Sequence, residues 1–148
     1  MRALIQRVIR AAVRVEDMTK GSIGPGMLVL LGVAATDTAN DADYLADKLL
    51  HLRIFSDDAG KMNRSALDAN AAFLVVSQFT LYGDCRKGRR PGFDAAAPPA
   101  RARDLYEYFT RRIRESGLET QTGVFQAHMQ VELVNDGPVT FLVESPSS

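Results

Sequence analysis

The sequence predicts an α/β fold, built as one strand-rich domain with two helices. Its 148 residues fit one domain with room for a substantial core. Several segments alternate apolar and polar residues or are continuously apolar, which is typical of β-strands. Two others repeat apolar residues every three or four positions, as helices do. The hydrophobic fraction of 46% and the charged fraction of 24% are ordinary for a globular protein.

The first part of the chain predicts two or three strands. Residues 2–16 alternate between two sets of side chains, which indicates one long bent strand or two short ones. The next segment, "MTKGSIGPG" at residues 18–26, has the glycine and proline content of turns. Residues 27–35, "MLVLLGVAA", are apolar on both faces, as expected for a strand that is buried on both sides.

The middle of the chain predicts a helix and two further strands. Thr36, Asp37 or Thr38 can cap a helix over residues 38–51, whose apolar residues lie three or four apart. Residues 53–63, "RIFSDDAGKMN", indicate a short strand with a glycine turn. Residues 71–81, "AAFLVVSQFTL", indicate a buried strand that leads into an irregular loop over residues 82–97.

The last part predicts the second helix and the final strands. Pro98 and Pro99 open this helix and Gly117 ends it. Two or three strands follow, interrupted by "NDGP" at residues 135–138, since proline has no N–H to give to a strand ladder. We expect residues 1–145 to form the single domain and residues 146–148 to be a frayed tail.

Composition and charge exclude several classes of function. The formal net charge is zero, so any nucleic-acid binding must rest on a local patch. The single cysteine, Cys85, excludes an internal disulfide and suits a reducing compartment. His51 and His128 have no second ligand at metal spacing, so neither a metal site nor a cofactor is predicted. The alternating N-terminus is not a signal peptide, and no apolar run could span a membrane, which favours a cytoplasmic protein.

Two segments carry the chemistry that the sequence offers. In "VVSQFTLYGD" a buried strand runs directly into Ser77, Gln78 and Thr80, which gathers hydroxyl, amide and backbone N–H groups at one point. In "NDGPVT" a Gly-Pro step separates two strand-like stretches, although a simple hairpin would need only Asn-Gly or Asp-Gly. Taken separately, the first is compatible with a plain strand end and the second with a plain turn.

Together, the two segments resemble the D-aminoacyl-tRNA deacylase (D-tyrosyl-tRNA deacylase) family. The blocks "LIQRV", "VLLGV", "RIFSDDAGKMN", "VVSQFTL", "RPGF", "TQTG" and "NDGPVTF" occur in order over nearly the whole chain. The resemblance implies mixed β-sheets that form a barrel-like core with two flanking helices. It also implies a homodimer that binds the acceptor end of D-aminoacyl-tRNA. Such enzymes hydrolyse the ester between the D-amino acid and the 3′-terminal adenosine.

The resemblance also assigns candidate site residues. The catalytic group is Ser77, Gln78, Phe79 and Thr80. The substrate-binding group is Gly137, Pro138, Val139, Thr140, Arg7, Phe125 and Met129. In the family the Gly-Pro peptide bond is cis and enters the site from the partner subunit, and Arg7 would hold this segment in place. Phe125 and Met129 are equally compatible with plain core, and Arg7 with a strand residue that faces water.

This arrangement would select handedness by exclusion. Carbonyl oxygens of the Gly-Pro segment would accept hydrogen bonds from the α-ammonium of the substrate, and an L side chain would then run into the backbone. Glycine has no side chain to exclude, so glycyl-tRNA should be cleaved as well. The cationic loop residues Arg86, Lys87, Arg89 and Arg90, with Phe93, would contact tRNA phosphates and the terminal adenine, although such a charge run is also typical of a solvated loop.

The route of hydrolysis stays open between two alternatives. Thr80 could attack the ester, but no base lies near it in the sequence. The lack of a base favours a route in which the substrate's ribose 2′-hydroxyl activates water, while Gln78 and backbone N–H groups near Phe79 and Thr80 stabilise the oxyanion. His128 stands where the family commonly has Asp, which puts local details or the pH response in doubt.

Three other functions compete with this interpretation. One is a non-catalytic nucleic-acid-binding relative on the same fold, such as the DNA-unwinding-element-binding proteins, which carry an extended C-terminal tail. Another is a related deacylase with a trans Gly-Pro bond and a relaxed filter for handedness. The third is a generic serine or threonine esterase, against which the missing base argues.

Overall fold

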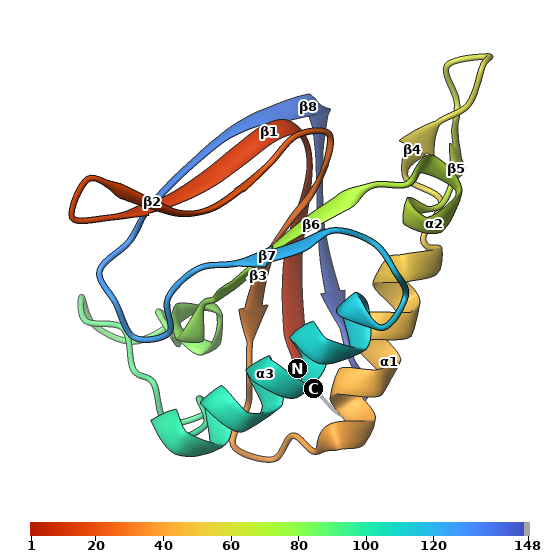
Figure 1. The fold of residues 1–148 in the computed structure, drawn as a ribbon. Coiled ribbons are helices and arrows are strands. Elements are labelled where there is room, and N and C mark those ends of the chain that lie inside the picture. Colours follow the sequence, from red (N-terminus) through yellow and green to blue (C-terminus); the bar gives the residue numbers. More distant parts are fainter. Residues whose placement is uncertain (147–148) are drawn as a thin grey trace.

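The computed structural model describes residues 1–146 and folds them into a six-stranded sheet, a separate two-stranded hairpin and three α-helices (Figure 1). The expected tail at 146–148 lies mostly outside the described residues, since only Pro146 belongs to them. The large sheet comprises β1 (Arg2–Val15), β2 (Met18–Ile23), β3 (Gly26–Gly32), β6 (Ala72–Ser77), β7 (Thr120–Thr122) and β8 (Gln130–Glu144). The hairpin pairs β4 (Phe55–Ser56) with β5 (Met62–Arg64).

The long strand β1 organises the sheet. One edge of β1 pairs with β3 and then with β2, and its other edge pairs with β8, all antiparallel. Beyond β3 the sheet continues through the parallel strands β6 and β7. The two ends of this path then approach each other, because a Cβ on Gly21 of β2 would lie 2.4 Å from the carbonyl oxygen of Thr122 in β7. Only glycine permits this approach, which leaves the barrel nearly closed.

Two apolar clusters fill the molecule, one on each face of β3. Side chains of β1, β3 and β6 pack against α1 and α3 in the larger cluster, which includes Phe73 and Phe109. The smaller cluster lies inside the curved sheet and includes Val13, Leu28 and Leu74. Because consecutive residues of β3 enter different clusters, the expected burial of this strand on both faces is confirmed.

The helices begin where the sequence offers caps. α1 (Ala39–His51) starts after Thr38, which forms a capping box with Asp41. α3 (Pro99–Arg114) has proline in its first turn, as expected. The expectation of only two helices missed the short α2 (Ala66–Ala69), which is capped by Ser65. Four residues are too few to show the periodicity by which a longer helix is found.

Three expectations about the strands are wrong in detail. Residues 18–23 form β2, because pairing with β1 overrides their turn-like composition. The strand expected over residues 71–81 ends at Ser77, and Phe79–Tyr82 form a 3₁₀ helix, η1. Residues 135–138 do not separate two strands. They lie within β8, which remains one strand because its register against β1 shifts near Val8.

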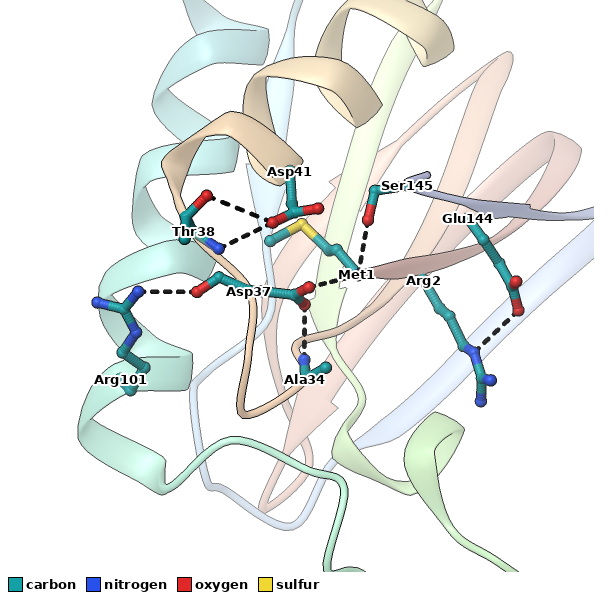
Figure 2. Close-up of polar contacts among 9 residues, drawn as sticks. All are labelled: Met1, Arg2, Ala34, Asp37, Thr38, Asp41, Arg101, Glu144 and Ser145. Carbon is teal, nitrogen blue, oxygen red and sulfur yellow. Dashed lines mark hydrogen bonds and ion pairs between the residues drawn. The ribbon is translucent and has the colours of Figure 1, made fainter. Parts of the chain in front are cut away.

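A buried polar cluster joins both ends of the described chain to the helices (Figure 2). The α-ammonium of Met1 donates to Asp37 Oδ1 at 2.8 Å and to Ser145 Oγ at 2.9 Å. The other carboxylate oxygen of Asp37 accepts from the N–H of Ala34 at 2.6 Å. The backbone carbonyl of Asp37 accepts from Arg101 of α3 at 2.7 Å. This cluster therefore fixes the start of β1, the end of β8 and the loop after β3 with respect to α3.

Candidate active site

A pocket of about 630 Å³ opens where β6 ends, and three separate segments build it. The first segment supplies Ser77, Gln78 and Phe79 at the end of β6. The others are the loop before α3, with the start of that helix, and the stretch that leads into β8. Their lining residues are Phe93, Ala96, Ala97, Pro99 and Ala102 from the former, and Phe125, Gln126, Ala127, His128, Met129 and Val131 from the latter.

The polar wall of the pocket is made by the turn from β6 into η1. The N–H of Gln78 donates to the carbonyl of Leu31 at 2.8 Å, which fixes this turn to β3. The side-chain amide of Gln78 donates to the hydroxyl of Thr80. Since the first N–H groups of a helix have no partner within it, those of Phe79 and Thr80 remain as donors in this turn, and Phe79 lines the pocket. Such a set can bind an oxygen that carries developing negative charge.

The apolar wall is aromatic and is supported from both sides. The rings of Phe79 and Phe93 lie 5.0 Å apart between centroids, and the two residues are 53% and 38% exposed. Asp84 and Gly92 exchange backbone hydrogen bonds of 2.7 and 2.9 Å, which closes the loop directly before Phe93. On the opposite side, the ring of Phe125 packs edge-on against Tyr106 at 5.9 Å. Exposed aromatic faces of this kind can stack on a nucleobase.

Titratable groups are scarce in this pocket. Among the described residues that line it, His128 is the only one with an ionisable side chain, and it is exposed. In the nearby cationic loop, Arg86 forms a two-pronged ion pair with Asp84, with bonds of 2.9 and 2.8 Å. These bonds lower the pKa of Asp84 to about 2. The charge of Arg86 is thus partly neutralised. Lys87, Arg89 and Arg90 are exposed, as Arg86 is.

The Gly137–Pro138 segment lies outside the pocket of its own chain. This peptide bond is cis, and Gly137 has a φ of +134°, at which a Cβ would meet the Val139 side chain at 2.6 Å. Asn135 braces the segment, because its side chain accepts from the N–H of Val139 at 3.0 Å and donates to Thr140 at 2.9 Å. The pocket lining includes none of these residues.

Arg7 ties the same segment to the β4 region. Its Nε donates to the carbonyl of Asp136 at 3.1 Å and lies 3.5 Å from the carboxylate of that residue. Its Nη1 donates to the carbonyl of Ile54 at 2.8 Å. The guanidinium therefore crosslinks two backbone segments that are far apart in the sequence.

The structure brings together part of the predicted set. Ser77, Gln78, Phe79, Phe93, Phe125 and Met129 share the pocket, whereas Thr80, Arg7 and residues 137–140 do not line it. Sequence reasoning missed the small residues Ala96, Ala97 and Pro99, for which the run "AAAPPA" was the available signal, and also Ala102. In the part of the chain that the structure describes, no group of three or more His, Cys, Asp or Glu is arranged to hold a metal. No helix within residues 1–146 is long and apolar enough to cross a bilayer.

The nearly closed sheet with its two covering helices defines the class of proteins with the deacylase fold. A solved structure described as a probable eukaryotic D-amino acid tRNA deacylase shares this fold, with a TM-score of 0.84 over 97% of this chain and 98% of the other at 18% identity. The c-Myc DNA unwinding element binding protein superposes with a TM-score of 0.92, covers 99% of each chain and is 41% identical.

Sequence comparison identifies the family. The model of the D-Tyr-tRNA(Tyr) deacylase family matches residues 4–144, so the chain belongs to this family. Proteins named D-aminoacyl-tRNA deacylase from Koribacter versatilis and Anaeromyxobacter dehalogenans are 60% and 61% identical to it, each over 98% of this chain and 97% of the relative.

Proposed function

We propose that this protein hydrolyses the ester between a D-amino acid and the 3′-terminal adenosine of tRNA. The observation that carries the proposal is the pocket in which Ser77, Gln78 and Phe79 face Phe93, Phe125 and Met129. It combines polar donors for an ester carbonyl with aromatic surface for an adenine. Family membership and the names of the similar proteins support this substrate class. A cytoplasmic location, where tRNA is charged, remains a prediction.

In the proposed reaction, water attacks the ester carbonyl and the RNA assists. The backbone N–H groups of Phe79 and Thr80, with the Gln78 amide, stabilise the oxyanion. The ribose 2′-hydroxyl next to the ester positions or activates the water. Thr80 is less suited to act as the nucleophile, because its hydroxyl accepts a hydrogen bond from the Gln78 amide, which is not a base.

Handedness would be selected by a second copy of the chain. The Gly137–Pro138 segment is outside its own pocket, so we propose that it enters the pocket of a partner in a homodimer. Ile9 on β1 and Phe141 and Leu142 on β8 are exposed apolar side chains in the strands that carry Arg7 and this segment, which supports an interface there. Backbone oxygens held in place by Arg7 would fix the substrate α-ammonium and leave no room for an L side chain. Glycyl-tRNA would pass this filter.

The cationic loop would hold the acceptor end. Lys87, Arg89 and Arg90 are exposed on the segment that carries Phe93, so phosphates next to the terminal adenosine would meet them. Arg86 would contribute less, because Asp84 already pairs with it. Charge reversal of Arg89 or Arg90 should raise KM and weaken its dependence on salt.

The experiment that tests the function compares three substrates. Purified protein is incubated with D-Tyr-tRNA, L-Tyr-tRNA and Gly-tRNA, and release of the amino acid is followed. We expect hydrolysis of the first and third and none of the second above the spontaneous rate. A Gln78→Ala variant serves as the site control. Equal cleavage of D-Tyr-tRNA and L-Tyr-tRNA would refute the proposed selection of handedness. If none of the three substrates is cleaved, the proposed enzymatic activity is refuted.

The second candidate, a nucleic-acid-binding protein without activity, is favoured by the likeness to the DNA unwinding element binding protein. The same experiment separates the two, because this candidate binds nucleic acid but releases no amino acid. The higher identity to the proteins named as deacylases favours the enzyme.

A further inference from the structure

A second hollow, of about 550 Å³, adjoins the pocket and shares Phe125 with it. One of its walls is an exposed stripe of α3 formed by Arg103, Glu107, Arg111 and Arg114, which follow one another at intervals of three or four residues. The other wall is the end of β7 and the loop after it, residues 122–125. We call this hollow the α3 groove.

The α3 groove is cationic. Its lining carries three arginines and a single carboxylate, Glu107, which pairs with Arg103 at 3.5 Å. The side chain of Arg114 makes no hydrogen bond or ion pair with any residue that the structure describes, and Arg111 only packs over the ring of Tyr108 at 5.3 Å. Two guanidinium groups are therefore available to an anion. Arg103 and Arg111 are eight residues apart, or about 12 Å along the helix axis, which suits an extended polyanion better than a single small ion.

The groove is continuous with the candidate active site. Phe125 lines both hollows, and the guanidinium of Arg103 lies 5.2 Å from the centroid of its ring. An RNA strand whose 3′ end occupies the pocket therefore has a path past Phe125 onto the arginine stripe. Arginine suits such a role, because its planar fork binds phosphate oxygens in pairs.

We propose that Arg103, Arg111 and Arg114 of the α3 groove bind the phosphate backbone of the RNA whose 3′ end enters the pocket. This inference rests on the proposed function and extends its substrate contacts beyond the terminal adenosine. The groove contacts phosphates and no reacting atom. Its loss should weaken the binding of a long RNA and leave the chemical step unchanged.

The test compares two substrates that differ only in their phosphates. D-Tyr-tRNA carries the backbone, and the D-tyrosyl ester of adenosine carries none. For Arg111→Glu and Arg114→Glu we expect KM for the tRNA to rise about fivefold, with a slope of log KM against log salt that is smaller by about one. We expect kcat to stay constant and the adenosine ester to be cleaved as by the wild type.

Two controls accompany these variants. Lys61→Glu reverses a charge on the turn of the β4–β5 hairpin, which lies beside α2 and away from the groove (Figure 1). Arg114→Lys keeps the charge of the groove. Lys61→Glu should bind tRNA nearly as the wild type does, and Arg114→Lys should bind it less tightly than the wild type but more tightly than Arg114→Glu. If KM for the tRNA is the same in Arg114→Glu and Lys61→Glu, the proposed binding of phosphates in the α3 groove is refuted. An equal loss of activity with both substrates would also refute it, because that result would indicate a structural defect.

The groove can be judged even if the proposed activity fails. If the wild type cleaves neither substrate, the affinity for uncharged tRNA is measured by fluorescence anisotropy. Weaker binding by Arg111→Glu and Arg114→Glu than by Lys61→Glu would retain the groove as an RNA site. Unchanged binding would overturn it separately from the deacylase proposal.

Discussion

The guanidinium of Arg7 donates to the carbonyl oxygen of Asp136, 3.1 Å away, and so holds the residue that precedes Gly137. The same guanidinium donates to Ile54 at 2.8 Å. Only a forked side chain can make both contacts. The conformation of the Gly-Pro segment therefore depends on a residue far away in the sequence.

Arg7→Lys should lower kcat/KM for D-Tyr-tRNA by roughly 10- to 100-fold, because a misplaced positioning group can cost about this much. The variant should remain folded, as judged by circular dichroism. Arg10→Ala, an exposed position on the same strand, is the matched control and should be nearly neutral. Equal activity of both variants would show that the contacts of Arg7 with Asp136 and Ile54 do not affect the active site.

Removal of the Thr80 hydroxyl should have little effect on turnover. Because we assign activation of water to the substrate, Thr80→Ala should retain kcat within about threefold, with no acyl-enzyme detected by mass spectrometry. A substrate with a 2′-deoxy terminal ribose should react at least about 100-fold more slowly. A deoxy substrate that reacts at the normal rate would refute the RNA-assisted route.

Substitution of His128 tests whether the protein supplies a general base in the pocket. His128 is the one ionisable side chain among the described residues that line the pocket. If water is activated by the substrate, His128→Gln should leave kcat/KM within about threefold across the pH range. A general base would instead be worth about 10²–10⁴-fold, so a loss of that size would assign the role to His128.

Asp37 should be essential for stability. It faces the α-ammonium of Met1, and both groups have side-chain exposures of 0% (Figure 2). Asp37→Asn removes the carboxylate of a buried ion pair, and we expect the free energy of unfolding in urea to fall by about 3–5 kcal/mol. Asp47→Asn removes an exposed carboxylate that pairs with His51 and should change stability by no more than about 1 kcal/mol. Similar denaturation midpoints for the two variants would contradict this account.

Tyr106 should titrate at unusually high pH. Its hydroxyl donates to the carbonyl of Val75 at 2.8 Å, and burial raises the pKa of Tyr106 to about 12. The folded state holds this proton more tightly than the unfolded chain, whose tyrosines titrate near pH ~10. The stabilisation from this group is therefore complete below pH ~10 and is lost as the pH rises towards ~12. Ultraviolet titration of the wild type and Tyr106→Phe should differ by a step in this range.

Local signals in the sequence were sufficient for the elements that depend on local chemistry. The candidate caps Thr36, Asp37 and Thr38 predict the start of α1, and the two prolines predict the start of α3. The strand at residues 18–23 could not be predicted in the same way, because Gly21 is there to let the backbone of β7 approach. The role of Gly21 depends on its contact with Thr122, which lies far away in the sequence.

The candidate site also has one part that local sequence signals predict and another part that depends on distant contacts. The Ser-Gln-Phe motif was visible because it follows a buried strand directly. Its pocket was only partly visible, since the second wall comes from residues 93–102 and the third from residues 125–131. The α3 groove was not predicted, because the sequence shows a helix with many arginines but not which of them face β7.

The contact between Phe79 and Phe93 offers a direct way to observe the pocket. The chain contains no tryptophan, so Phe93→Trp would introduce a single indole at the pocket mouth. Its emission would report the polarity of that position alone. Quenching by an adenosine analogue would then measure ligand entry in real time, without a radioactive label or a coupled assay.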